Sequence, residues 1–175
     1  MIKKMNEFIN LFFKRRSVRK FTSEPVSQDD LTTLLKAAMS APSGWNAQPW
    51  EFVVIREEET LEIIRKSLMF AKMVAPVAIC VLGSQRMQTH ESGNDLWKQD
   101  CSAASENILM AATALGLGAV WIGVHPVFVF EKQLSGILNL PEGTRPFSLI
   151  YVGHPAEEKE PRTQYDESRV HWGRY

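Results

Sequence analysis

The sequence predicts an α+β fold, in which a mixed or mostly antiparallel sheet lies between layers of helices. Helical patterns and strand-like runs interleave along the chain without the strict alternation that a doubly wound parallel sheet requires. The strand-like run at 77–82 is continuously apolar, and we expect those at 119–124 and 147–152 to be core strands as well, which indicates that both faces of the sheet are covered. A length of 175 residues fits a single domain, which we assign to residues 1–175.

Charge, cysteine content and hydropathy narrow the possible function classes. Twenty Lys and Arg residues balance twenty Asp and Glu residues, so there is no net field to attract nucleic acid or an anionic membrane. Cys80 and Cys101 lie far apart and have neither metal-ligand nor redox spacing. No stretch approaches the roughly 20 apolar residues that a membrane-spanning helix needs. We therefore expect a cytoplasmic protein that binds no nucleic acid, no membrane and no metal.

The first half of the chain predicts three helices and one strand. Apolar residues recur with helical spacing between Met5 and Phe12. Ser27 can cap a second helix, because Asp30 follows three residues later, and this helix should stop at Pro42. The next expected elements are a strand at 50–55 and a helix at 57–67.

The second half is expected to contain the longest helix, at 96–117, and a shorter helix at 130–138. The long helix is apolar on nearly every face in its second part, so it is either a central core rod or packed against a copy of itself. In so short a chain we favour a homodimer with this helix in the interface. The polar loop at 83–95 before it is either mobile or a lid, and His90 in this loop has no orienting partner nearby in the sequence.

A basic segment, Lys14–Phe21, follows the first helix and reads K-R-R-S-V-R-K-F. If it is extended, Arg15, Ser17 and Arg19 share one face, and guanidinium groups match phosphate oxygens well. The segment therefore predicts a site for a compact dianion. The alternative is a solvated basic run that closes the helix, where cations suit the negative end of the helix dipole.

The connection at 42–49 is pinned between two prolines and is rich in amide and hydroxyl side chains. Such a loop loses little entropy on binding, which favours hydrogen bonding to a flat polar ring. It is equally typical of an ordinary helix-to-strand turn. Both interpretations stay open from these residues alone.

Three glycines, Gly116, Gly118 and Gly123, do not form a dinucleotide-binding motif. They follow a helix and precede a strand, which reverses the required order. Gly123, inside a predicted strand, indicates close approach by another backbone or a ligand.

The segment after Gly153, about 154–175, is charged and has no apolar periodicity until Val170 and Trp172. It cannot form a core of its own, so it should lie on another surface, and in an intertwined dimer this would be the partner subunit. The alternative is a solvated tail. Its candidate anion contacts are Arg162, Arg169 and Arg174.

Taken in order, these motifs resemble the FMN-dependent nitroreductase family over nearly the whole chain. The resemblance rests on five stretches in register: Arg15–Phe21, Ala41–Trp50, the long helix leading into Gly116–Gly123, Val152–Pro155 and Ser168–Arg169. It implies a three-layer sandwich, with a central sheet flanked by helices, in an intertwined homodimer with two flavins at the interface.

The resemblance also implies roles for individual residues. Arg15, Arg16 and Ser17 would bind the FMN phosphate and ribityl chain, joined by Arg169 from the tail. Arg19 would lie at the N1/O2 edge of the flavin, where its charge stabilises the reduced ring.

Two further groups of contacts are implied by the same resemblance. The other subunit would contribute Pro42, Ser43, Asn46 and Gln48. The backbone of Trp121, Ile122 and Gly123 would meet flavin N5 and O4. Members of the family often place a polar contact to the pyrimidine edge before the second strand, where this chain reads S-L-M-F-A-K at 67–72.

The implied activity is hydride transfer from NADH or NADPH through the flavin to a nitroaromatic, a quinone or a related small acceptor. Because the cofactor carries the chemistry, the resemblance assigns no catalytic side chain. The alternatives are a flavin-binding module without turnover, used for storage or sensing, and a specialised reductase such as a dehalogenase-like relative.

Overall fold

The computed structural model describes residues 6–84 and 96–175. His90 and nearly all of the expected loop at 83–95 lie outside the described residues. The described chain forms a four-stranded sheet with strand order β1-β2-β4-β3, in which each neighbouring pair is antiparallel. The α+β class is therefore confirmed, with an antiparallel sheet.

The four strands lie close to the positions that the sequence predicted for them. β1 spans Trp50–Ile55, β2 spans Val77–Ser84, β3 spans Gly118–Gly123 and β4 spans Thr144–Gly153. β4 begins three residues earlier than the expected run at 147–152, because its first residues continue the pairing with the end of β2. The long central pair β2–β4 forms the middle of the sheet and places β3 at one edge.

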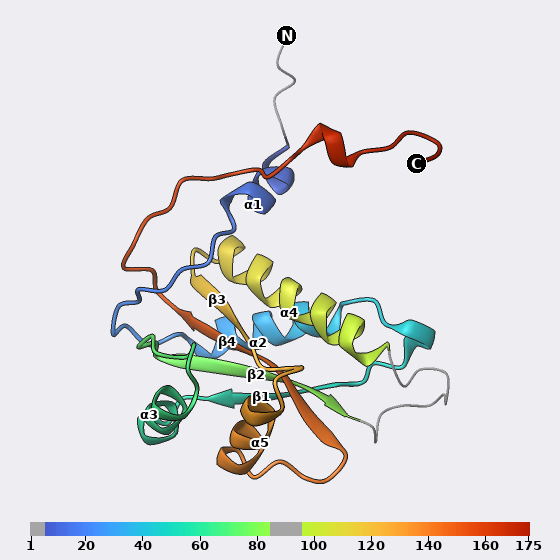
Figure 1. Ribbon diagram of the computed structural model, residues 1–175. Helices are drawn as coiled ribbons and strands as arrows, with labels where there is room; N and C mark the ends of the chain where they lie inside the picture. Colours follow the sequence, from blue (N-terminus) through green and yellow to red (C-terminus); the bar gives the residue numbers. More distant parts are fainter. Residues whose placement is uncertain (1–5, 85–95) are drawn as a thin grey trace.

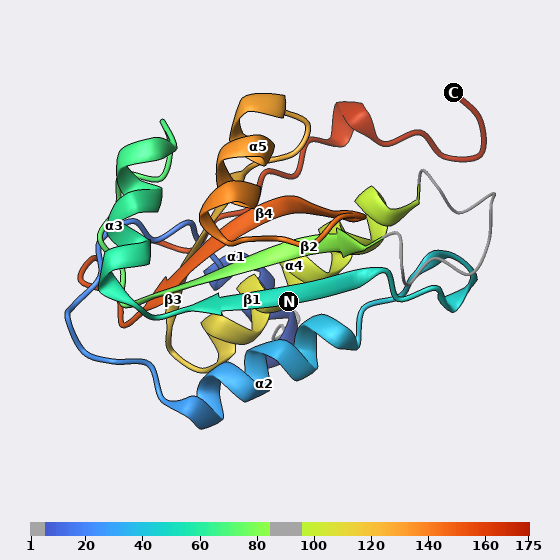
Figure 2. The same ribbon diagram turned by 90° about the horizontal axis from the view of Figure 1, so that it is seen from below.

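Helices cover both faces of this sheet, as Figures 1 and 2 show. α2 (Gln28–Met39) and α4 (Trp97–Ala114) lie on one face, and α3 (Glu58–Ser67) and α5 (Phe128–Ile137) lie on the other. Ile79 and Ile150 belong to the hydrophobic cluster on the α2/α4 side. Their neighbours Cys80 and Tyr151 belong to the cluster on the α3/α5 side. Neighbouring residues of the central strands are both apolar because alternate side chains are buried on opposite faces of the sheet, in different clusters.

Local sequence signals explain where the helices begin and end. The Ser27 hydroxyl oxygen accepts a hydrogen bond from the Asp30 N–H at 3.0 Å, which caps α2 as predicted. α4 ends at Ala114, three residues before the expected end at 117. Gly116 adopts a left-handed conformation with φ 74°, which stops the helix and turns the chain into β3.

α1 (Glu7–Lys14) lies outside the sandwich, next to the C-terminal segment (Figure 1). Its apolar side chains are largely exposed, with Phe8 74% and Phe12 60% accessible. The short 3-10 helices η1 (Gly44–Asn46) and η4 (Glu167–Arg169) lie in the loop before β1 and in the tail. No helix among the described residues has the length and apolar character to cross a membrane.

Candidate functional site

The basic segment lies against the start of β3. The Val18 N–H donates a hydrogen bond to the Ala119 carbonyl at 3.0 Å, and Ser17 forms a parallel bridge with Ala119. Gly118 makes this approach possible, because a methyl group there would lie 2.7 Å from Cγ1 of Val18 and 2.9 Å from its Cβ. The segment therefore runs along the edge of the sheet at this point, which is the extended case that the sequence left open.

The first part of the tail, 154–162, runs beside the basic segment in the same chain (Figure 1). Lys159 Nζ donates to the Ser17 carbonyl at 2.7 Å, and the Arg16 guanidinium donates to the Glu160 carbonyl. Backbone hydrogen bonds also join Thr22 to His154, Ala156 to Lys20 and Arg162 to Phe13. The basic segment is thus held between β3 and the tail.

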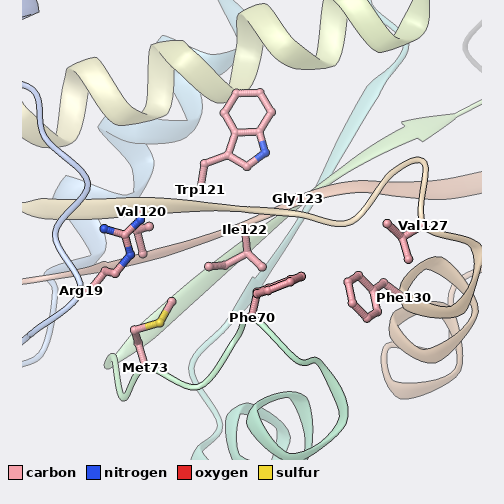
Figure 3. A pocket seen from close by; sticks show the side chains of 9 residues that line it. All are labelled: Arg19, Phe70, Met73, Val120, Trp121, Ile122, Gly123, Val127 and Phe130. Atoms are coloured by element: carbon pink, nitrogen blue, oxygen red, sulfur yellow. The ribbon is translucent and has the colours of Figure 1, made fainter.

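Glu157 fixes the backbone of the basic segment at Arg19. Its carboxylate accepts the Arg19 N–H at 2.6 Å and lies 3.2 Å from Lys159 Nζ. The Arg19 N–H is the main reason that the pKa of Glu157 lies below its usual range, and Lys159 acts in the same direction. The Arg19 side chain points into the adjacent cavity (Figure 3).

This cavity has a volume of about 390 Å³ and opens beside β3. Arg19 enters it from the basic segment, Phe70 and Met73 from the α3–β2 connection, and Val127 and Phe130 from the α5 region (Figure 3). The rings of Phe70 and Phe130 meet edge to face with centroids 6.1 Å apart. The remaining lining residues are Val120, Trp121, Ile122 and Gly123 of β3.

β3 contributes backbone as well as side chains to the cavity. The Trp121 side chain points away from the cavity toward α4 in Figure 3 and stacks edge-on against Phe147 at 5.7 Å. A methyl group at Gly123 would have no described atom within 4 Å, so the space beside this residue is open. An edge strand presents N–H and C=O groups that no neighbouring strand satisfies. Backbone donors, one guanidinium and apolar walls together suit a flat ring with hydrogen-bonding atoms along one edge.

Arg15 contacts the longest helix. Its Nε lies 3.4 Å from Oε1 of Glu106 on α4, and both side chains are partly exposed. Burial raises the pKa of the Glu106 carboxyl, and the Arg15 guanidinium acts in the opposite direction. The sequence did not single out Glu106, because a Glu in a helix is usually solvated.

The loop at 42–48 lies at the other end of the molecule from the basic segment in both Figure 1 and Figure 2. Trp45, Asn46 and Gln48 have left-handed φ angles of 56°, 54° and 47°. The Ser43 hydroxyl oxygen accepts the Gln48 N–H at 3.0 Å. Hydrogen bonds within the loop therefore hold its backbone in a strained conformation. Such strain concentrates at functional sites.

Asp100 anchors this loop to α4. Its Oδ1 accepts the Gly44 N–H at 3.0 Å. Burial raises the pKa of Asp100, and the Gly44 N–H partly offsets this effect.

One chain therefore brings together only part of the predicted site. Ser17 and Arg19 lie next to β3 with Trp121, Ile122 and Gly123. Arg15 lies against Glu106 of α4, and the Arg16 guanidinium donates to the Glu160 carbonyl of the tail. Arg169 lies on the extended tail, where its Nε contacts Asp166 Oδ2 at 3.1 Å. Pro42, Ser43, Asn46 and Gln48 are on the distant loop.

Sequence reasoning did not find the apolar wall of the cavity. In the stretch at 67–72, the polar candidate Lys72 donates from Nζ to the Arg65 carbonyl at 2.7 Å. Phe70 and Met73 line the cavity instead. They lie in a connection without periodicity, so no pattern in the sequence distinguishes them from other loop residues.

The two cysteines are buried and free, and they lie apart from the cavity lining. Burial raises the pKa of Cys101 to about 12, with a smaller contribution from Asp100, and raises that of Cys80 further. Neither thiol is therefore activated as a nucleophile. In the described ranges, no group of three or more His, Cys, Asp or Glu side chains could hold a metal ion.

Comparison with known proteins agrees with this fold. The family model described as "Nitroreductase family" matches residues 13–72 and 66–154, which include the basic segment, the loop before β1 and β3. The chain belongs to the nitroreductase family. A relative from Archaeoglobus fulgidus, whose name proposes NADH dehydrogenase/NAD(P)H nitroreductase activity, is 39% identical over 172 residues. The alignment covers 95% of this nitroreductase family member and 98% of the relative.

Solved structures of similar proteins share the fold along almost the entire chain. A Bacteroides thetaiotaomicron protein with the same proposed activity in its name has a TM-score of 0.91 and 36% identity, covering 98% of this chain and 100% of that one. An FMN-dependent nitroreductase from Clostridium difficile has a TM-score of 0.83 and 31% identity, covering 95% and 99%. These similarities confirm the nitroreductase fold that the sequence motifs predicted.

Replacement of Gly118 by Ala tests the contact between the basic segment and β3. The new methyl group would collide with Val18, so we expect the free energy of unfolding to fall by about 1–3 kcal/mol in urea denaturation. Gly136→Ala in α5 is the matched control, because its methyl group would have no neighbour within 4 Å. This control should be more stable by about 0.5–1 kcal/mol. Equal stability of Gly118→Ala and wild type would contradict the close packing.

Proposed function

We propose that this protein binds FMN and transfers hydride from NADH or NADPH, by way of the flavin, to a small acceptor such as a nitroaromatic or a quinone. The observation that carries this proposal is the cavity where Arg19 meets the backbone of β3, directly beside the basic segment. Membership of the nitroreductase family and the name of the Clostridium difficile structure support the choice of FMN.

The basic segment is the proposed phosphate site. Arg15, Arg16 and Ser17 carry the donors that suit phosphate oxygens, with Arg169 joining them from the tail. Binding of the segment to β3 and to the tail holds these donors in place before the ligand arrives, which reduces the entropy lost on binding.

The cavity is the proposed site of the flavin ring. Backbone groups of Trp121, Ile122 and Gly123 would bond N5 and O4 of the ring, and Arg19 would lie at its N1/O2 edge. FMN, when bound, supplies the hydride chemistry. The protein binds and orients the ring, excludes water with Phe70 and Phe130, and places a positive charge where the reduced ring gathers negative charge.

We propose further that a second copy of the chain completes the site. Pro42, Ser43, Asn46 and Gln48 would come from the partner subunit, since within one chain their loop lies far from the basic segment. The exposed apolar face of α1 and Trp172, which is 88% accessible, supply the surface that a homodimer would bury.

Sedimentation velocity should therefore give about twice the monomer mass of 19.9 kDa. Phe12→Ser should shift the protein toward the monomer, because it removes apolar area from the proposed interface. Phe128→Ser on α5 is the matched control, since Phe128 is similarly exposed but lies on the opposite side of the sheet. A strictly monomeric wild type would overturn the shared site.

The activity itself is tested by mixing the flavin-loaded protein with NADH or NADPH in the absence of oxygen. We expect the flavin absorbance to bleach within seconds, and a nitroaromatic or quinone to restore it. Bound flavin that does not bleach would identify a non-catalytic module. Bleaching with poor turnover of nitroaromatics would identify a specialised reductase, such as a dehalogenase-like enzyme.

Arg15→Ala tests the phosphate site. Loss of a charge-assisted hydrogen bond costs about 1.5–3 kcal/mol, so FMN affinity should fall roughly tenfold or more in fluorescence titration. Arg56→Ala is the control, because Arg56 is exposed and contacts Gln28 on the α2 side of the chain. Unchanged FMN retention in Arg15→Ala would count against this assignment.

A further inference from the structure

Glu106 stands next to the proposed phosphate site without being a phosphate ligand. It projects from the middle of α4 toward the end of α1, where its Oε1 lies 3.4 Å from Nε of Arg15. Its side chain is 47% accessible and that of Arg15 is 27% accessible. A carboxylate here has the same sign of charge as the ligand that Arg15 is proposed to bind.

Within the described part of the chain, Arg15 is the charged group that lowers the pKa of Glu106. Residues one turn away on α4, Ser102, Ala103 and Met110, are uncharged. The next residue, Asn107, donates from Nδ2 to the Ala37 carbonyl at 2.9 Å and so faces α2. The charge of Glu106 is therefore balanced mainly by a single guanidinium.

We propose that Glu106 takes up a proton from solvent when a phosphate dianion binds at Arg15, so that the contribution of Glu106 to FMN binding becomes more favourable as the pH falls. This inference rests on the proposed role of Arg15 as a phosphate contact. The reaction is a simple protonation of a carboxylate to a carboxylic acid, with the proton supplied by the buffer and no change of oxidation state.

The physical reason is competition for one cation. A dianion beside Arg15 repels the Glu106 carboxylate and takes part of the guanidinium that stabilises it. Burial has already raised the pKa of Glu106 above its ordinary value of 4.5, and Arg15 is the group that holds it down. Phosphate binding must therefore raise this pKa further.

The sign of the pH dependence follows from linkage. Between the pKa of Glu106 in the free protein and its higher pKa in the complex, the complex binds more protons than the free protein. In this window, which begins above the ordinary value of 4.5, the contribution of Glu106 to the affinity increases as the pH falls. At higher pH both forms carry the carboxylate, and its repulsion weakens binding by a constant factor.

Glu106→Gln separates charge from alignment, because the amide keeps the size and shape of the side chain beside Arg15 while removing its charge. A partly exposed ion pair contributes little free energy by itself, so the loss of repulsion between Glu106 and the phosphate should dominate the change in FMN affinity. At about pH 8 we expect Glu106→Gln to bind FMN about three- to tenfold more tightly than wild type. This difference in affinity should shrink as the pH falls, because wild-type Glu106 becomes protonated in the complex before it does in the free protein.

Isothermal titration calorimetry in buffers of different ionisation enthalpy measures the protons taken up. The FMN phosphate itself titrates near pH 6, so the quantity of interest is the difference in proton uptake between wild type and Glu106→Gln.

Glu62→Gln on α3, which removes an exposed carboxylate paired with Lys66, is the matched control and should behave as wild type. Riboflavin, which lacks the phosphate, should bind wild type without this uptake, and this comparison needs no variant.

Equal proton uptake in wild type and Glu106→Gln, or weaker FMN binding by Glu106→Gln at about pH 8, would overturn the inference. The second result would mean that Glu106 serves only to align Arg15. Failure of the underlying site has a different signature, because Arg15→Ala would then retain FMN. If Arg15→Ala loses affinity while Glu106→Gln leaves the pH dependence unchanged, the phosphate site stands and only the coupling to Glu106 is wrong.

Discussion

The hydrogen bond from the Val18 N–H to the Ala119 carbonyl is the contact on which the arrangement of the site depends. It joins a segment near the start of the chain to an edge strand that is about a hundred residues away in sequence. Gly118 permits the contact by leaving room for Val18, and Glu157 secures the segment from the other side. The backbone at Arg19 is thus held by β3 on one side and by Glu157 on the other, and its side chain enters the cavity.

The position of β3 at the edge of the sheet has a second consequence. An unpaired edge normally invites association with another strand, and proteins cover or block it. Here Ser17 covers the beginning of β3, while the cavity opens beside Trp121–Gly123. In the proposed function, a flat ring would satisfy these backbone groups and would occupy the open space beside Gly123.

Much of the fold could be predicted because local patterns report local constraints. Ser27 and Asp30 form their cap within a few residues, and the continuous apolar strands reflect burial on both faces of the sheet. The cavity wall could not be predicted in this way. Phe70 lies in a connection and is 62% exposed, so its place depends on how α3 and α5 pack rather than on its neighbours in sequence.

The sequence alone determined the α+β class, the cap of α2, the cluster of basic residues after α1 and the polar loop at 42–48, because each depends on residues close together in the chain. Only the tertiary structure decided which of these features meet. It placed Arg19 beside β3, turned Glu106 toward Arg15, and kept the loop at 42–48 at a distance. The physical reason is that contacts across long stretches of chain depend on sheet order and helix packing, which leave no periodic signal around any single residue.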